Sequence, residues 1–180
     1  MVYVLLGTGF EETEAIVPVD LLRRAGVDVL TVGINGKIIY GSHKIGIEAD
    51  ITIDEMDLGR MDMIVLPGGL GGVASIRANQ LAMKALGFAK ENGKWIAAIC
   101  AAPTILAELG ITDGRAAVCY PGCEKNMGNA RIMTDVPCVR DDRVITGASA
   151  GCAAAFALEL ITALKGQEEA QRIAHQIVIR

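Results

Sequence analysis

A cysteine at the junction between an apolar stretch and a run of small residues has the clearest chemistry in this chain. The apolar, strand-like residues 96–99 end on Cys100, and Ala101-Ala102-Pro103 follow. This order is typical of a nucleophile elbow, in which a sharp strand-to-helix turn lifts a reactive side chain above a sheet. A helix N-terminus beneath the sulfur favours the thiolate, which attacks electrophiles. On this segment alone, a buried structural cysteine explains the pattern equally well.

Two other segments carry groups that could assist such a cysteine. Pro67-Gly68-Gly69 follows the apolar run 63–66, and N–H groups at a glycine pair can hold an anion or a developing oxyanion. The alternative is a purely structural role for the glycine pair, as a tight turn. Glu11, Glu12 and Glu14 open an expected helix, where carboxylates complement its positive end. A carboxyl pressed beside a sulfur in a pocket has a raised pKa and can move protons.

A nucleotide cofactor and a metal are both disfavoured by the motifs. Gly7-Thr8-Gly9 lacks the third glycine of a dinucleotide fingerprint, and Glu11 and Glu12 would repel a pyrophosphate. Cys119 and Cys123 have weak spacing for zinc and no histidine nearby in sequence. We therefore expect no cofactor and no metal.

The elements that position these groups alternate between strand and helix. Strands are expected over 2–6, 28–34, 63–66 and 94–99, and helices over 11–25, 75–91, 101–109, 150–165 and 168–177. Two β pieces within 37–53, around Gly41-Ser42, predict a hairpin or a projecting loop, and Pro18 predicts a kink or an altered first turn in the first helix. Short strands near 116–119 and 143–146 flank an irregular stretch. Repeated βα units predict a doubly wound, mostly parallel sheet with helices on both faces, whose ligands bind beyond the carboxyl ends of the strands.

The composition fits one domain over residues 1–180. Hydrophobic residues make up 52%, aromatic residues 4%, and the mean hydropathy is +0.40, as expected for strands covered on both faces. No apolar run reaches the ~18 residues of a membrane span, and the start lacks the basic segment of a signal peptide. An odd count of five cysteines without C-x-x-C spacing predicts a reducing cytoplasm. A net charge of −4 without a basic cluster argues against nucleic acid.

Three motifs, in this order, resemble the ThiJ/PfpI superfamily. They are Glu11-Glu12-Thr13-Glu14 with Pro18-Val19-Asp20 and Arg23-Arg24-Ala25-Gly26, then Leu66-Pro67-Gly68-Gly69, then Ala98-Ile99-Cys100-Ala101-Ala102-Pro103-Thr104. The most similar branch contains the Parkinsonism-associated protein deglycase and its bacterial relatives, and the resemblance runs nearly end to end. It implies a flavodoxin-like fold, as in class I glutamine amidotransferases, with Cys100 on the elbow as nucleophile. It also implies Glu14 as a protonated carboxyl beside the thiolate, and amides of Gly68, Gly69 and Ala101 as an oxyanion site.

Several positions depart from the family pattern. Peptidases of the superfamily place a histidine directly after the nucleophile, and Ala101 stands there, which argues against peptidase activity. The deglycase branch often has a histidine about twenty residues later, where this chain has Tyr120. The two histidines, His43 and His175, are far from the cysteine in sequence, which leaves a Cys–Glu pair rather than a triad. Residues 146–152 also differ, and we expect them to reshape one pocket wall.

The resemblance implies a cofactor-independent glyoxalase or protein deglycase. Cys100 would add to the aldehyde of methylglyoxal, glyoxal or a glycated adduct, Glu14 would move a proton between adjacent carbons, and hydrolysis would release lactate or glycolate. Two alternatives stay open. One is a redox sensor or chaperone that uses oxidation of Cys100 without turnover, and the other is the thiazole-biosynthesis role attached to the family by name. No residue points to phosphate or thiazole binding.

Two further expectations concern the thiol and the assembly. The helix terminus and Glu14 predict a Cys100 pKa well below the usual ~8.5. Relatives of this branch pair as homodimers, so Arg24, His43 and His175 are predicted to reach the neighbouring subunit's Cys100 pocket. A solvated hairpin residue explains His43 equally well.

Overall fold

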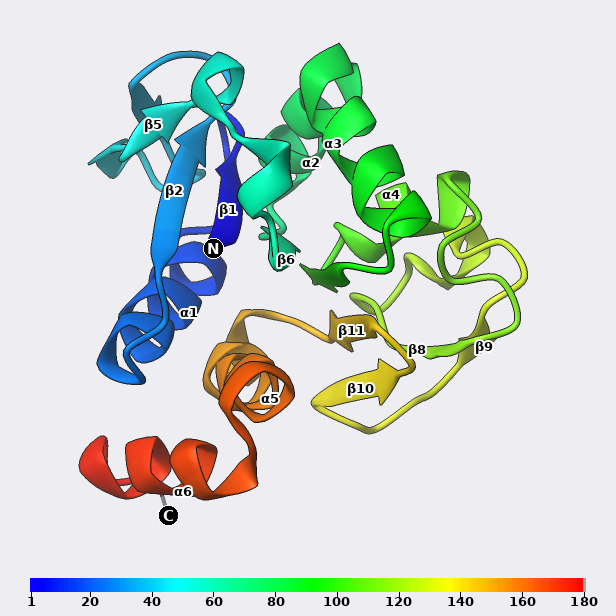
Figure 1. The fold of residues 1–180 in the computed structure, drawn as a ribbon. Helices are drawn as coiled ribbons and strands as arrows, with labels where there is room; N and C mark the ends of the chain where they lie inside the picture. The colour runs from blue at the N-terminus through cyan, green and yellow to red at the C-terminus, as the bar shows by residue number, and fades with distance from the viewer. Residues whose placement is uncertain (180) are drawn as a thin grey trace.

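Seven strands form one sheet through the centre of the structure, a computed structural model that describes residues 1–179. Their spatial order is β10-β11-β7-β6-β1-β2-β5, and every neighbouring pair is parallel except the edge pair β10–β11 (Figure 1). The bounds are β1 Val2–Leu6, β2 Val29–Gly33, β5 Ile51–Thr52, β6 Met63–Leu66, β7 Trp95–Ile99, β10 Cys138–Asp141 and β11 Val144–Gly147. The predicted flavodoxin-like, doubly wound sheet is confirmed.

β1 shows why these residues form interior strands. All five of its residues are buried, without the polar–apolar alternation of a strand that has one face in water. Val2, Val4 and Leu6 contribute to one hydrophobic core, and Tyr3 and Leu5 contribute to the other, because successive side chains point to opposite faces. Both faces of the sheet are packed, so functional groups reach solvent at the strand ends.

Six helices cover the two faces of the sheet among the described residues. α1 (Glu12–Arg24), α5 (Ala153–Lys165) and α6 (Gln167–Gln176) pack on the core that holds Val4. α2 (Leu70–Ala78), α3 (Gln80–Glu91) and α4 (Pro103–Glu108) pack on the opposite core, and Figure 1 shows the two groups on opposite sides of the sheet. None of the helices in residues 1–179 is long and apolar enough to cross a membrane.

The structure corrects the single helix predicted over 75–91. Two helices stand there, because α2 already begins at Leu70 and the chain becomes extended at Asn79. The Asn79 side chain accepts hydrogen bonds from the N–H groups of Leu81 and Ala82, both at 3.0 Å, and so caps α3. Asparagine is a preferred N-cap residue, and this signal was present in the sequence. α1 runs as one helix through Pro18, and the kink expected there stays a prediction.

Short β pieces outside the main sheet complete the description. The predicted hairpin is confirmed as β3 (Ile38–Tyr40) paired antiparallel with β4 (Gly46–Glu48). The stretch read as irregular holds β9 (Arg131–Ile132), which pairs with β8 (Ala116–Ala117), and the edge strand β10. β10 escaped prediction because it carries Arg140 and Asp141 and is only partly buried, so it has no apolar run.

Candidate active site

Cys100 occupies a strained turn between β7 and α4. Its backbone has φ +66°, a left-handed conformation that costs a non-glycine residue about 1–3 kcal/mol. Two hydrogen bonds hold the turn: the Cys100 N–H donates to the Gly147 carbonyl at 2.9 Å, and the Tyr120 N–H donates to the Cys100 carbonyl at 2.8 Å. The surrounding chain thus fixes the elbow that the sequence predicted, with a half-buried thiol at its tip.

Backbone amides surround the sulfur. The N–H groups of Gly69 and Ala101 donate toward Sγ of Cys100. Gly69 caps α2 with φ +80°, a conformation that glycine adopts without steric cost. These two amides come from the ends of neighbouring strands, β6 and β7, and they lie where an anionic sulfur or oxygen next to it would be stabilised.

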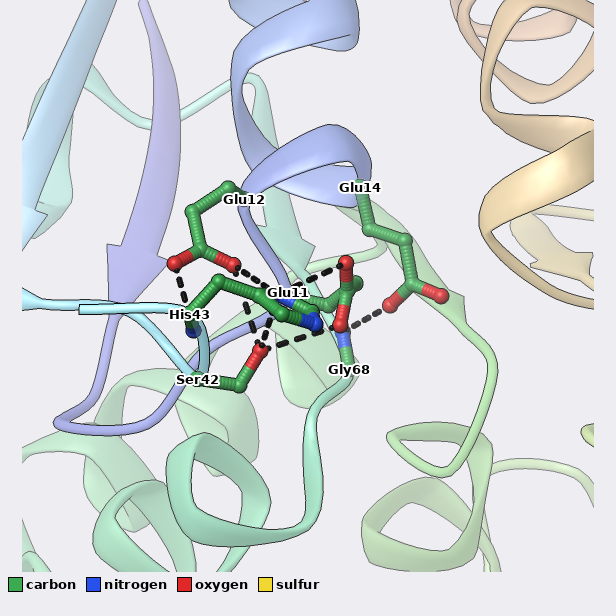
Figure 2. Close-up of polar contacts among 6 residues, drawn as sticks. All are labelled: Glu11, Glu12, Glu14, Ser42, His43 and Gly68. Atoms are coloured by element: carbon green, nitrogen blue, oxygen red, sulfur yellow. Dashed lines mark hydrogen bonds and ion pairs between the residues drawn. The ribbon is translucent and has the colours of Figure 1, made fainter. Parts of the chain in front are cut away.

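Glu14 lies beside the sulfur and is completely buried. Its Oε2 accepts a hydrogen bond from the Gly68 N–H at 2.8 Å (Figure 2). Oε1 has no hydrogen-bond partner among the described residues. Burial raises the pKa of Glu14 to about 7, because the carboxylate loses its hydration there. Glu14 is therefore able to hold a proton at neutral pH.

The predicted low pKa of Cys100 is wrong while Glu14 is ionised. Burial, and after it the Glu14 charge and hydrogen bond, raise the pKa of Cys100 to about 12. The two groups therefore share one proton near neutral pH, in either of two arrangements. One holds a thiol and a carboxylate, and the other holds a thiolate and a carboxylic acid. The second arrangement is the nucleophilic one, and the two amides favour it.

Gly68 makes this close approach sterically feasible. A Cβ atom added to Gly68 would lie 2.5 Å from Oε2 of Glu14 and 2.6 Å from Cβ of Cys100. Real Cβ contacts of that length essentially do not occur. Only glycine fits between the acid and the nucleophile, so Gly68 contributes both its N–H and its missing side chain.

A cavity of about 810 Å³ opens over the Cys–Glu pair. Its wall includes the segment after β1, the turn of the β3–β4 hairpin, the start of α2 and the segment before α5. The residues that line it are Gly9, Glu11, Glu14, Ser42, His43, Gly69, Leu70, Gly71, Cys100, Ala101, Tyr120, Ser149, Ala150 and Gly151. Ser149, Ala150 and Gly151, within the departure at 146–152, therefore form part of the wall.

His43 lines the cavity of its own chain, and its predicted approach to a neighbouring subunit stays a prediction. The hairpin turn folds back on the segment after β1, because the Gly9 N–H donates to Tyr40 and the Ser42 N–H donates to Phe10, both at 2.8 Å. The sequence could not predict this placement, because the hairpin turn and the segment after β1 lie far apart along the chain and meet only in the folded structure.

Arg24 and His175 do not line the cavity within the chain. Arg24 lies at the other end of α1, about 15 Å along the helix axis from Glu14, and its Nε donates to Asp20 at 2.9 Å. His175 lies in the last turn of α6. Tyr120, half exposed, does line the cavity.

Glu11, Glu12 and His43 form the one group of three potential metal ligands found in residues 1–179. Their ligand atoms lie within 4.8 Å of one another. Nδ1 of His43 is already hydrogen-bonded to Oε2 of Glu12 at 2.9 Å, and Ser42 donates to both carboxylates. These bonds satisfy the cluster internally, so its geometry by itself carries no argument for an ion.

Comparisons with known proteins agree with this architecture. The sequence matches the DJ-1/PfpI family over residues 1–163. Protein dj-1beta of Drosophila melanogaster is 35% identical over 178 residues, covering 98% of this chain and 95% of that protein. A deglycase of Pyrococcus abyssi is 30% identical over 165 residues, covering 91% and 99%.

Solved structures of DJ-1 proteins superpose closely on this chain. The crystal structure of Drosophila melanogaster DJ-1beta superposes with a TM-score of 0.95 at 35% identity, covering 99% of this chain and 97% of that one. A mutant of a DJ-1 superfamily protein from Salmonella typhimurium gives 0.93 at 34% identity, with coverage of 99% and 98%. Oxidized DJ-1 of Toxoplasma gondii gives 0.90 at 31% identity, with coverage of 98% and 97%.

Proposed function

This chain belongs to the DJ-1/PfpI family, and from that premise we propose that it is a cofactor-independent enzyme of the deglycase or glyoxalase type. Its substrates would be methylglyoxal, glyoxal or the adducts they form on other molecules. The observation that carries the proposal is the buried Glu14 beside Cys100, with two amides on the sulfur and a cavity above them.

The first step is the addition of Cys100 to an aldehyde. In the thiolate arrangement, Sγ attacks the aldehyde carbon and the carbonyl oxygen becomes a hydroxyl by taking the proton of Glu14, which yields a hemithioacetal and a Glu14 carboxylate. The Gly69 and Ala101 amides support the negative charge on sulfur before the attack. The pair supplies both the nucleophile and the proton, so the step needs no external acid.

The second step moves a proton between neighbouring carbons. The Glu14 carboxylate takes the proton from the former aldehyde carbon and returns it to the adjacent carbon. The hydroxyl proton on the former aldehyde carbon passes to the oxygen of the adjacent carbon, which leaves a thioester of a 2-hydroxy acid. A pKa of about 7 suits a group that must both accept and donate near neutral pH. Water then hydrolyses the thioester, releasing lactate or glycolate and restoring the thiol.

Two parts of this proposal concern the setting of the enzyme. We place it in the cytoplasm, because five cysteines without C-x-x-C spacing suit a reducing compartment. We also propose a homodimer, in which Arg24 and His175 of one subunit approach the cavity of its partner. Both groups lie outside the cavity of their own chain, so only pairing would bring them to a site.

A second candidate function is redox sensing through Cys100 without turnover. The observation that favours it is the half-buried thiol next to a carboxyl group, and a solved relative at 31% identity is an oxidized form. Peptidase activity and thiazole synthesis remain without support, since Ala101 follows the nucleophile and neither lysine nor arginine is among the residues that line the cavity.

Lactate formation from methylglyoxal by the wild type and by Glu14→Gln tests the proposal. Glutamine keeps the shape of the side chain and cannot carry the proton, so we expect the rate to fall by roughly 10²–10⁴-fold. Glu91→Gln, at the end of α3 and outside the cavity, serves as the control. A wild type that makes no lactate while peroxide oxidises its Cys100 would favour the sensor instead.

A further inference from the structure

The turn of the β3–β4 hairpin holds His43 in a cradle, formed by Glu11, Glu12 and Ser42, beside the cavity. One carboxylate binds it twice: Oε1 of Glu12 accepts from the His43 backbone N–H at 2.8 Å, and Oε2 lies 2.9 Å from Nδ1 of the same residue. Ser42 Oγ lies 3.0 Å from Nδ1 and donates to Glu11 and Glu12. Figure 2 shows this network at the start of α1, close to Glu14.

The cradle is built into the fold rather than being a chance surface contact. Glu12 is buried, with a side chain only 10% exposed, and its carboxylate fills the space beneath Gly41. A Cβ atom at Gly41 would overlap that carboxylate. Backbone hydrogen bonds also fasten the hairpin to the segment after β1 on both sides of the turn. The position of His43, whose own side chain is 69% exposed, is therefore fixed by a largely buried carboxylate and by backbone hydrogen bonds.

We propose that His43, oriented by Glu12, is a second proton carrier of the Cys100 cavity, and that it serves the oxygen next to the aldehyde carbon of a 1,2-dicarbonyl substrate. This inference rests on the function proposed above. Nδ1 is occupied by Glu12, which leaves Nε2 as the ring nitrogen available to a substrate. Glu12 acts through His43 and is a positioning residue.

The charges around His43 favour its protonated form. The hydrogen bond to Glu12 raises the pKa of His43, and the charges of Glu11 and Glu12 raise it further. Oε1 of Glu11 lies 3.7 Å from Nδ1, so the ring has two carboxylates as neighbours. An imidazolium can donate a proton from Nε2, which a neutral ring with its proton on Nδ1 cannot do.

The chemical step balances without an added reagent. After addition of the sulfur, the Glu14 carboxylate takes the proton from the first carbon, a double bond forms to the second carbon, and the electrons of its carbonyl move to oxygen. That oxygen takes the proton from Nε2 of His43. Nε2 then recovers a proton from the hydroxyl on the first carbon, and Glu14 returns its proton to the second carbon. The product is the thioester of a 2-hydroxy acid.

This role predicts a preference among substrates. A simple aldehyde has no second oxygen for His43 to serve, so His43 contributes nothing to its addition to Cys100. A 1,2-dicarbonyl compound uses both proton carriers. His43→Gln should therefore slow turnover of methylglyoxal while leaving alkylation of Cys100 unchanged.

The first test measures the pKa of the His43 ring by NMR titration, with the signal assigned by its loss in His43→Gln. We expect the pKa to lie above the ordinary value near 6.5 in the wild type and to fall in Glu12→Gln. This readout does not depend on any substrate. Equal pKa values in the two proteins would overturn the positioning role of Glu12.

The second test compares kinetics with methylglyoxal in the wild type, His43→Gln and Lys44→Gln. Lys44 lies next to His43 in the same turn and outside the cavity, so it controls for loss of a positive charge. We expect kcat to fall by roughly 10²-fold in His43→Gln only, with an unchanged rate of Cys100 alkylation by iodoacetamide. The wild-type rate should also decline as pH rises through the His43 pKa, and His43→Gln should lack that decline.

The outcomes separate the two proposals. A wild type that turns over methylglyoxal, with His43→Gln equally active, overturns the role of His43 and leaves the Cys–Glu chemistry intact. A wild type that produces no 2-hydroxy acid overturns the proposed function and this inference with it. A loss of Cys100 alkylation in His43→Gln would contradict the inference as well, because it would place His43 in the activation of the sulfur.

Discussion

Replacing Gly68 by alanine should separate the Cys–Glu pair while leaving both groups in the protein. The backbone of Gly68 lies outside the left-handed region, so alanine adopts it without strain and the effect is steric. Ordinary contact begins at 3.4 Å, and the new methyl would lie 2.5 Å from Oε2 of Glu14 and 2.6 Å from Cβ of Cys100. Each group must therefore move by about 1 Å, a displacement that can cost about 10²-fold in rate. Overpacking of this kind also destabilises by about 1–3 kcal/mol.

Two assays report on Gly68→Ala. The rate of lactate formation should fall by about 10²-fold, and the rate of Cys100 alkylation by iodoacetamide should change because the carboxyl no longer lies against the sulfur. Gly87→Ala is the matched control, since nothing lies within 4 Å of a Cβ at that position in α3. If Gly68→Ala folds and keeps wild-type values in both assays, the close Cys–Gly–Glu arrangement is not what makes Cys100 reactive.

Three further variants test the local physics. Asn79→Ala removes the cap of α3 and should lower the free energy of unfolding in urea by about 1 kcal/mol. Burial alone would raise the pKa of Glu12, but hydrogen bonds from His43 and its neighbours lower that pKa to about 2. The ionised Glu12 therefore stabilises the fold above pH 4.5, and this stabilisation is lost as the pH falls toward 2. The stability gap between wild type and Glu12→Gln should therefore narrow over that window in acid titrations. Burial raises the pKa of Glu14 to about 7, so ionisation of Glu14 disfavours folding. In thermal unfolding, the stability of Glu14→Gln relative to the wild type should therefore increase as pH rises from 4.5 to 7.

The strands of the central sheet were predictable because each satisfies a local rule. β1 and β6 were predicted with their observed bounds, since a strand buried on both faces is an unbroken apolar run. The edge strand β10 follows no such rule, because its partly exposed residues include Arg140 and Asp141. At Asn79 the sequence did carry a capping signal, but the helical pattern on both sides of it led to the prediction of one helix instead of two.

The residues of the candidate site also fall into those that the sequence could place and those that it could not. Cys100, Glu14 and the glycine pair follow strands or open a helix, so a parallel sheet brings them to one edge without any long-range information. His43 could not be placed, because its position depends on how the hairpin folds back over the start of α1. The pKa of Cys100 was mispredicted for a related reason, since burial and the charge of Glu14 outweigh the amides that favour the thiolate.

The central claim is that Cys100 is the nucleophile that turns a dicarbonyl compound into a 2-hydroxy acid. It is tested most directly by the rate of lactate formation from methylglyoxal with the wild type, Cys100→Ser and Cys123→Ser, the last serving as a control outside the cavity. We predict lactate from the wild type and from Cys123→Ser, and none above the uncatalysed rate from Cys100→Ser. Lactate formed at the wild-type rate by Cys100→Ser would contradict the claim.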